Sequence, residues 1–198
     1  MRVDFYSFLP EAAKRQCAAL VQGHNVTINV VKERRTKHGD FRVQPYKPVT
    51  ITLNAMENHY RFLLTFLHEW AHYMVFSNFR LRKKPHGNEW KTAFQKVVTP
   101  FFTNDIFPNE LLAALKDHMQ KPRATFSADP RLMHVLRQFD PPNDKKCIFE
   151  LEQEMLFSID DGRLFRKGVK RRTRFLCTCI KTKKQYLFPP FVEVNPVL

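Results

Sequence analysis

One helical segment constrains the fold of this chain more than any other stretch, because it is apolar on almost every side. Residues 57–78 place Leu, Ala and Val at helical spacing on one side, and Phe, Trp and Tyr cover much of the remainder. A helix that leaves no face for water must pack inside a core. Polar side chains on it therefore need a specific reason, and His68, Glu69 and His72 are such side chains.

The spacing of these three residues is that of a metal site. His68 and His72 are four residues apart, so they share one face of the helix and can bind the same Zn²⁺ ion. Glu69 lies beside the pair, where it can take a proton from a water that the ion acidifies. The segment HEWAH thus predicts a catalytic zinc site with Glu69 as general base. Two buried structural histidines are the alternative, which is disfavoured because unpaired imidazoles are costly to bury.

A catalytic zinc site needs a third protein ligand, and the residues leave two candidates. His86 ends a loop expected at 80–87, and Glu89 lies in the first turn of a helix expected at 88–98. Imidazole suits zinc well, and Gly87 is expected to supply an unusual backbone angle beside His86. These grounds, together with the family resemblance described below, favour His86, with Glu89 as the alternative.

The remaining pattern mixes helices and strands, which indicates an α+β fold. Further helices are expected at 10–23, 108–120 and 129–139, and strands at 25–35, 37–44 and 49–56. The first two strands are expected to pair as a hairpin that turns at Gly39. The segment DPPNDKK, residues 140–146, is the best candidate boundary, because short strand signals replace helices after it. We therefore expect domains at 1–141 and 142–198.

The succession of HEWAH and PHGNEW resembles the SprT-like zinc metallopeptidases over about residues 5–110. In that family HExxH lies on one helix, and a third histidine begins H-G-x-x-[WF] at the start of the next. The matching residues are His68, Glu69, His72, His86, Gly87 and Trp90. The resemblance implies a protein substrate, one catalytic Zn²⁺ and a zincin-like, minigluzincin-type fold. Such a fold packs helices on a small antiparallel sheet, with a cleft under an edge strand that residues 49–54 would supply.

Many members of that family end in a zinc ribbon with two cysteine pairs. Here Cys177 and Cys179 have no second pair at suitable spacing. We therefore expect a small all-β, ribbon-like C-terminal region without zinc, held by apolar packing. The two cysteines would then be small apolar residues on one face of a strand.

Basic residues dominate the C-terminal region. The chain carries a net charge of +14, and residues 163–184 hold ten Lys or Arg without Asp or Glu. This run predicts contacts with the phosphates of DNA or RNA, and a solvated basic face is the alternative. The ten residues are Arg163, Arg166, Lys167, Lys170, Arg171, Arg172, Arg174, Lys181, Lys183 and Lys184.

These patterns converge on one functional hypothesis. No signal peptide, membrane span or disulfide framework is apparent, so we expect a cytoplasmic protein without a membrane partner, with association with the nucleoid as an option. Eukaryotic members of the family cut proteins crosslinked to DNA, so the resemblance implies a zinc endopeptidase acting on proteins associated with nucleic acid. The rival is a non-catalytic nucleic-acid-binding protein that retains a zinc site, and hydrolysis of a small amide is a third option. Glu69 argues for catalysis, because binding alone needs no base.

Overall fold

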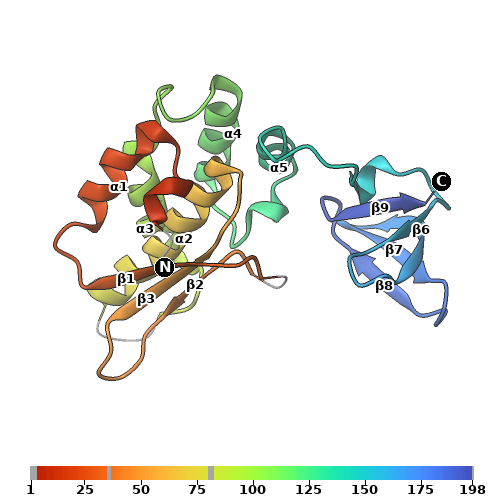
Figure 1. Cartoon of the computed structure of the whole chain (residues 1–198), viewed down its shortest axis with the longest axis horizontal. Coiled ribbons are helices and arrows are strands. Elements are labelled where there is room, and N and C mark those ends of the chain that lie inside the picture. The colour runs from red at the N-terminus through yellow and green to blue at the C-terminus, as the bar shows by residue number, and fades with distance from the viewer. Residues whose placement is uncertain (1–3, 35–36, 80–82, 198) are drawn as a thin grey trace. The chain divides into compact units, whose positions relative to one another are not determined.

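The chain forms two compact units, residues 1–141 and 142–198, each described here by itself (Figure 1). A computed structural model describes residues 4–34, 37–79 and 83–197. Part of the expected loop at 80–87, and Arg35 of the expected strand at 25–35, lie outside these ranges. Both helices and sheets are present, which confirms a mixed fold.

The helices of the first unit lie where the sequence predicts them. After two 3₁₀ turns, Phe5–Phe8 and Glu11–Ala13, come α1 (Lys14–Val21), α2 (His59–Asn78), α3 (Asn88–Val98), α4 (Asn109–Gln120) and α5 (Pro130–Arg137). Two more 3₁₀ turns span Thr99–Phe101 and Phe126–Ala128. Local signals set the ends: Gly23 has a φ of +77° just after α1, and the Asn58 side chain accepts a hydrogen bond from the Arg61 N–H at the start of α2.

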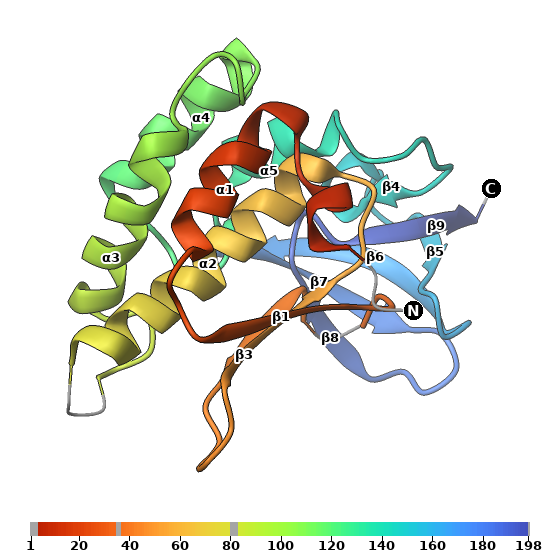
Figure 2. The ribbon, with the colours of Figure 1, turned by 60° about the vertical axis from the view of Figure 1, so that its left-hand side comes forward.

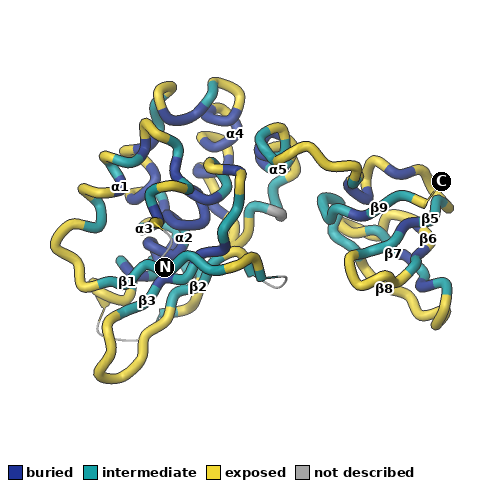
Figure 3. Tube along the Cα trace, in the orientation of Figure 1, coloured by how far each residue is buried: buried dark blue, intermediate teal, exposed yellow. Residues whose placement is uncertain are grey.

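Helix α2 is the centre of the first unit, in contact with α3 and with two strands of the sheet (Figure 2). Its side chains from Phe62 to Leu67 are all buried, as the dark trace in Figure 3 shows. The expectation that no face is left for water fails at the two ends of the helix. His59 in the first turn is exposed, and Phe76 in the last turn is 47% exposed.

The sheet of the first unit differs from the expected one. It contains β1 (Val26–Val31), β2 (Gly39–Arg42) and β3 (Val49–Asn54) in the order β1-β3-β2. Strands β1 and β3 are parallel, while β2 and β3 are antiparallel, so the sheet is mixed rather than antiparallel.

The strand that was expected at the edge lies in the middle. Residues 49–54 form β3, whose Ile51 and Leu53 are fully buried, and burial on this scale favours the central place. Strand β2 pairs with β3 instead of β1, so the expected hairpin at Gly39 is wrong. The reversal occurs between β2 and β3, where Pro45 and Pro48 interrupt the strand pattern. Strand β2 is therefore the edge strand on the side of α2.

The second unit contains β4 (Lys146–Cys147), a 3₁₀ turn at Ile148–Glu150, β5 (Leu156–Ser158), β6 (Leu164–Arg171), β7 (Arg174–Cys179), β8 (Gln185–Phe188) and β9 (Glu193–Val197). These strands pair in the order β4-β9-β5-β6-β7-β8. Cys177 and Cys179 are buried in a cluster with Phe157 and Phe165. None of the helices among the described residues has the length and apolar character that crossing a bilayer requires.

Candidate metal centre

Three histidines from two segments converge in the first unit. His68 and His72 leave the same face of α2, and His86 precedes α3. The Nε2 atom of His86 lies 3.1 Å from Nε2 of His72 and 3.1 Å from Nε2 of His68. Among the described residues these three form a group whose ligand atoms all lie within 4.8 Å of one another.

This arrangement fits a shared cation better than a hydrogen-bonded cluster. A neutral imidazole carries one ring proton, so His86 Nε2 cannot donate to both of its neighbours. Nitrogen atoms bound tetrahedrally at about 2.0–2.1 Å from a zinc ion lie about 3.3 Å apart, close to the spacing seen here. The donor set of three imidazoles is therefore suited to hold such an ion.

The surroundings keep the three rings neutral, as metal ligands must be. Burial lowers the pKa of His68 to about 3, and the nearby His72 and His86 add to the shift. Burial also lowers the pKa of His72 to about 4, with His86 contributing. The pKa of His86 is likewise lowered by burial. Near neutral pH each ring is therefore neutral and has one nitrogen with a lone pair free to bind a metal.

The backbone that brings His86 to the cluster is not the expected one. His86 itself adopts a φ of +56°, whereas Gly87 has an ordinary extended conformation with a φ of −70°. The left-handed angle thus falls on the histidine, which is uncommon for a residue with a side chain and is typical of functional sites. Gly87 is required for close packing instead, because a Cβ there would lie 3.0 Å from the Lys84 carbonyl oxygen.

The alternative ligand, Glu89, lies outside the cluster. Its carboxylate pairs with Lys83 at 3.3 Å, and the group of converging ligand atoms does not include it. Trp90, one residue further along α3, packs against the histidines instead. Its ring centroid lies 4.7 Å from those of His68 and His86, and its Nε1–H donates to the His68 carbonyl oxygen at 3.4 Å.

Glu69 lies beside the histidines and is 7% exposed. Burial raises the pKa of its carboxyl to about 7, and the negative charge of Asp40 adds to the rise. The backbone N–H of Phe41 donates a hydrogen bond to the same carboxylate and opposes the rise. A carboxyl that titrates near neutral pH suits proton transfer.

Strand β2 packs directly on the helix face that carries Glu69. A Cβ at Gly39 would lie 2.8 Å from Thr65 Cγ2, 2.9 Å from Glu69 Cγ and 3.0 Å from Glu69 Oε1. Two positions along the strand, the Phe41 ring stacks on His72 with centroids 6.3 Å apart. The edge strand therefore contacts both the carboxylate and a histidine of the cluster.

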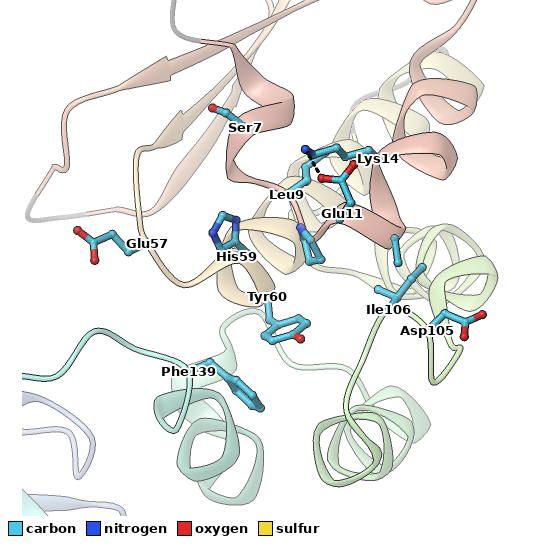
Figure 4. A pocket seen from close by; sticks show the side chains of 12 residues that line it. Ser7, Leu9, Glu11, Lys14, Glu57, His59, Tyr60, Asp105, Ile106 and Phe139 are labelled. Atoms are coloured by element: carbon cyan, nitrogen blue, oxygen red, sulfur yellow. Dashed lines mark hydrogen bonds and ion pairs between the residues drawn. The ribbon is translucent and has the colours of Figure 1, made fainter.

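The three histidines and Glu69 line an open cavity of about 900 Å³, to which β2, the end of α2 and residues 83–86 contribute. A second cavity, of about 670 Å³, lies at the start of α2 (Figure 4). Its lining includes Glu57, His59 and the Glu11–Lys14 ion pair, and none of the three clustered histidines. The chemistry of the histidines is therefore confined to the first cavity.

The basic residues of the second unit do not form one surface. Arg163 pairs with Asp161 at 2.9 Å, and Arg166 lies 3.6 Å from Glu154. Lys167 was expected at the surface but is 6% exposed; its ammonium donates to the Leu151 carbonyl. The remaining cations of residues 163–184 are exposed in two groups, at opposite ends of β7. Lys170, Arg171, Arg172 and Arg174 lie at the β6–β7 turn, and Lys181, Lys183 and Lys184 lie at the β7–β8 turn.

Sequence reasoning missed the contribution of β2. Gly39 was interpreted as a turn residue and Phe41 as an ordinary strand residue, yet both contact the candidate site. The exposed Phe76 and Phe79 at its mouth were also missed. Phe76 lies four residues after His72, so helical spacing could have placed it on the same face. No local signal marks Gly39, because its neighbours come from a distant helix.

Comparison with known proteins gives one match. The sequence model of the SprT-like family matches residues 7–110, which include β1–β3, α2 and α3 and all four candidate site residues. No curated protein and no solved structure matches the chain.

Proposed function

The chain belongs to the SprT-like family, and from this premise we propose that it is a zinc-dependent endopeptidase. His68, His72 and His86 hold the ion, and Glu69 is the general base. The observation that carries the proposal is the convergence of three neutral imidazole nitrogens beside a buried carboxylate in an open cavity. The peptidase chemistry belongs to the unit at 1–141, and a binding role to the basic unit at 142–198.

The residues present divide the chemistry between them. A bound zinc ion would acidify a water molecule and polarise the carbonyl group of a peptide bond. Glu69 would accept the proton of that water and pass it to the amine that leaves. The Phe41 N–H holds the carboxylate in place, and Trp90 packs against His68 and His86 so that their rings keep one orientation.

The substrate is proposed to be a protein associated with nucleic acid in the cytoplasm or nucleoid. Support comes from the seven exposed cations at the two turns that flank β7, which can contact phosphates without base specificity. A non-catalytic nucleic-acid-binding protein with a retained zinc site is the second candidate. It would keep the histidines and the basic turns but would not need Glu69.

Metal analysis and one substitution test the proposal together. We expect the purified protein to contain one zinc per chain and to digest casein, and a chelator to abolish the digestion. Glu69→Gln should retain zinc and lose cleavage by at least about 10²-fold, because the proton acceptor is gone. A Glu69→Gln variant that cuts as fast as wild type would refute the assigned role.

Paired substitutions test the ligand set and the rival. His86→Ala should lose zinc, while Glu89→Ala should keep it; the reverse result would make Glu89 the third ligand. Casein digestion with and without single-stranded DNA then tests the link to nucleic acid. A wild-type protein that binds zinc and DNA but cleaves nothing would favour the non-catalytic alternative.

A further inference from the structure

Large apolar side chains gather at the mouth of the cavity that holds the histidines. Among the described residues of the first unit, the large hydrophobic side chains that are exposed are Val43, Tyr46, Phe76 and Phe79. Three of them, Val43, Phe76 and Phe79, line this cavity. Isolated exposed hydrophobic residues are common, but a cluster of them on a soluble protein marks a binding surface.

These side chains continue directly from the metal ligands. The Phe41 ring stacks on His72, and its other neighbour is the Phe76 ring, with centroids 5.9 Å apart. Phe41, Val43, Phe76 and Phe79, which we call the apolar shelf, thus extend from the candidate metal centre to the cavity mouth. A chain bound across the histidines would place a neighbouring side chain on this shelf.

The charges around the shelf indicate which substrate side chains can bind there. Lys83 and Lys84 line the same cavity. The Lys83 ammonium lies 4.9 Å from the centre of the Phe79 ring and is paired with Glu89 at 3.3 Å, so Lys84 supplies the net positive charge beside the shelf. On β2, the carboxylate of Asp40 is already paired with Arg34, Lys37 and Arg42. A lysine or arginine of a substrate would therefore meet like charge here, whereas an acidic residue would meet opposite charge.

We propose that the cavity binds an extended peptide segment whose large apolar side chain lies on the apolar shelf, so that cleavage occurs beside apolar residues rather than basic ones. The inference rests on the proposed peptidase function and specifies its substrate class. Large apolar side chains are mostly buried in folded proteins. The preferred substrates are then unfolded segments or segments exposed by damage, even when the protein that carries them is bound to nucleic acid.

A pair of variants tests the shelf against a matched control. Phe76→Ser with Phe79→Ser removes two exposed shelf residues, so folding should be unaffected, which a thermal melt checks. Tyr46→Ser is the control, because Tyr46 is also exposed and lies between β2 and β3 but does not line the cavity. Cleavage sites in denatured casein would be mapped by mass spectrometry for all three proteins. We expect Leu, Ile, Met or Phe to be enriched beside the cut in wild type and in the control, and the enrichment to disappear in the double variant.

A binding measurement separates the shelf from catalysis. Zinc-loaded Glu69→Gln protein is titrated into two fluorescent peptides that differ at one position, which is Leu in one and Ala in the other. This position lies beside the mapped cut. If the wild-type protein cuts nothing, the peptides are taken instead from a casein segment around a Leu. We expect the Leu peptide to bind about tenfold or more tightly, and the shelf substitutions to remove the difference. Equal affinity for both peptides, or cuts enriched beside Lys or Arg, would overturn the shelf. Tighter binding of the Leu peptide without any wild-type cleavage would support the shelf and refute the peptidase function.

Discussion

Replacing Gly39 by alanine is the most direct test of how β2 acts on the site. The added methyl carbon would lie 2.8 Å from Thr65 Cγ2 and 2.9 Å from Glu69 Cγ. Non-bonded carbon atoms normally lie about 3.5–4.0 Å apart, so Glu69 Cγ must retreat by at least about 0.6 Å. Both neighbours are buried, Thr65 at 6% and Glu69 at 7% exposure, so neither can move away into solvent.

Two consequences follow from this crowding. Overpacking of a core contact costs about 1–3 kcal/mol of unfolding free energy. A shift of about 1 Å in a catalytic group can lower the rate about 10²-fold, so we expect kcat for a casein-derived peptide to fall by about tenfold to 10²-fold. Zinc content should stay at the wild-type level, because Gly39 contacts Glu69 and Thr65 rather than a ligand.

A second variant separates lost stability from lost positioning. Thr65→Ser in the Gly39→Ala background removes the methyl group that makes one of the short contacts and leaves the contact with Glu69. Urea unfolding should then show recovery of part of the stability, while kcat stays low. Wild-type kcat in Gly39→Ala, or full recovery of kcat in the double variant, would refute the conclusion that β2 holds Glu69.

Three further predictions concern the frame around the site. Asn58→Ala should lower the free energy of unfolding by about 2–3 kcal/mol in urea titrations, because the buried amide caps α2 and also bonds Asp140. Burial alone would raise the pKa of Asp129, but hydrogen bonds, above all from His118, lower it below 3.8. The Asp129 carboxylate therefore contributes fully to the free energy of unfolding above pH 3.8, and this contribution is lost as the pH falls below that value. The difference in unfolding free energy between wild type and Asp129→Asn should then narrow in acid, and a difference that stays constant would contradict this. Burial raises the pKa of the Cys17 thiol to about 12, so iodoacetamide at pH 8 should label it only after unfolding, as mass spectrometry would show.

Local patterns were sufficient to predict the helices and to bring His68 and His72 together on one helix face. The apolar repeat of 57–78 and the spacing of His68 and His72 are properties of a single helix, which short-range geometry determines. His86 and Glu89 could not be separated on that basis alone. Their difference depends on the turn before α3, where His86 adopts its left-handed angle. Histidine adopts this conformation more often than most residues, but too rarely to predict it at one position.

Long-range pairing explains most of what the sequence did not reveal. The order β1-β3-β2 depends on which strand buries both faces, and the alternation of β1 and β2 resembles that of β3 too closely to decide it. Lys167 was missed for a different reason. It lies two residues after the buried Phe165 and is buried with it, so alternation along β6 places it on the inner face, and only its charge suggested the surface.

The three histidines come from two different segments of the chain, with the two on α2 separated from the third by residues 73–85. A metal ion coordinated by all three would act as a removable crosslink between α2 and the turn before α3. Occupancy and folding would then be thermodynamically linked: the melting temperature would climb with free zinc concentration, and chelation would loosen the junction of these two helices before the rest of the unit.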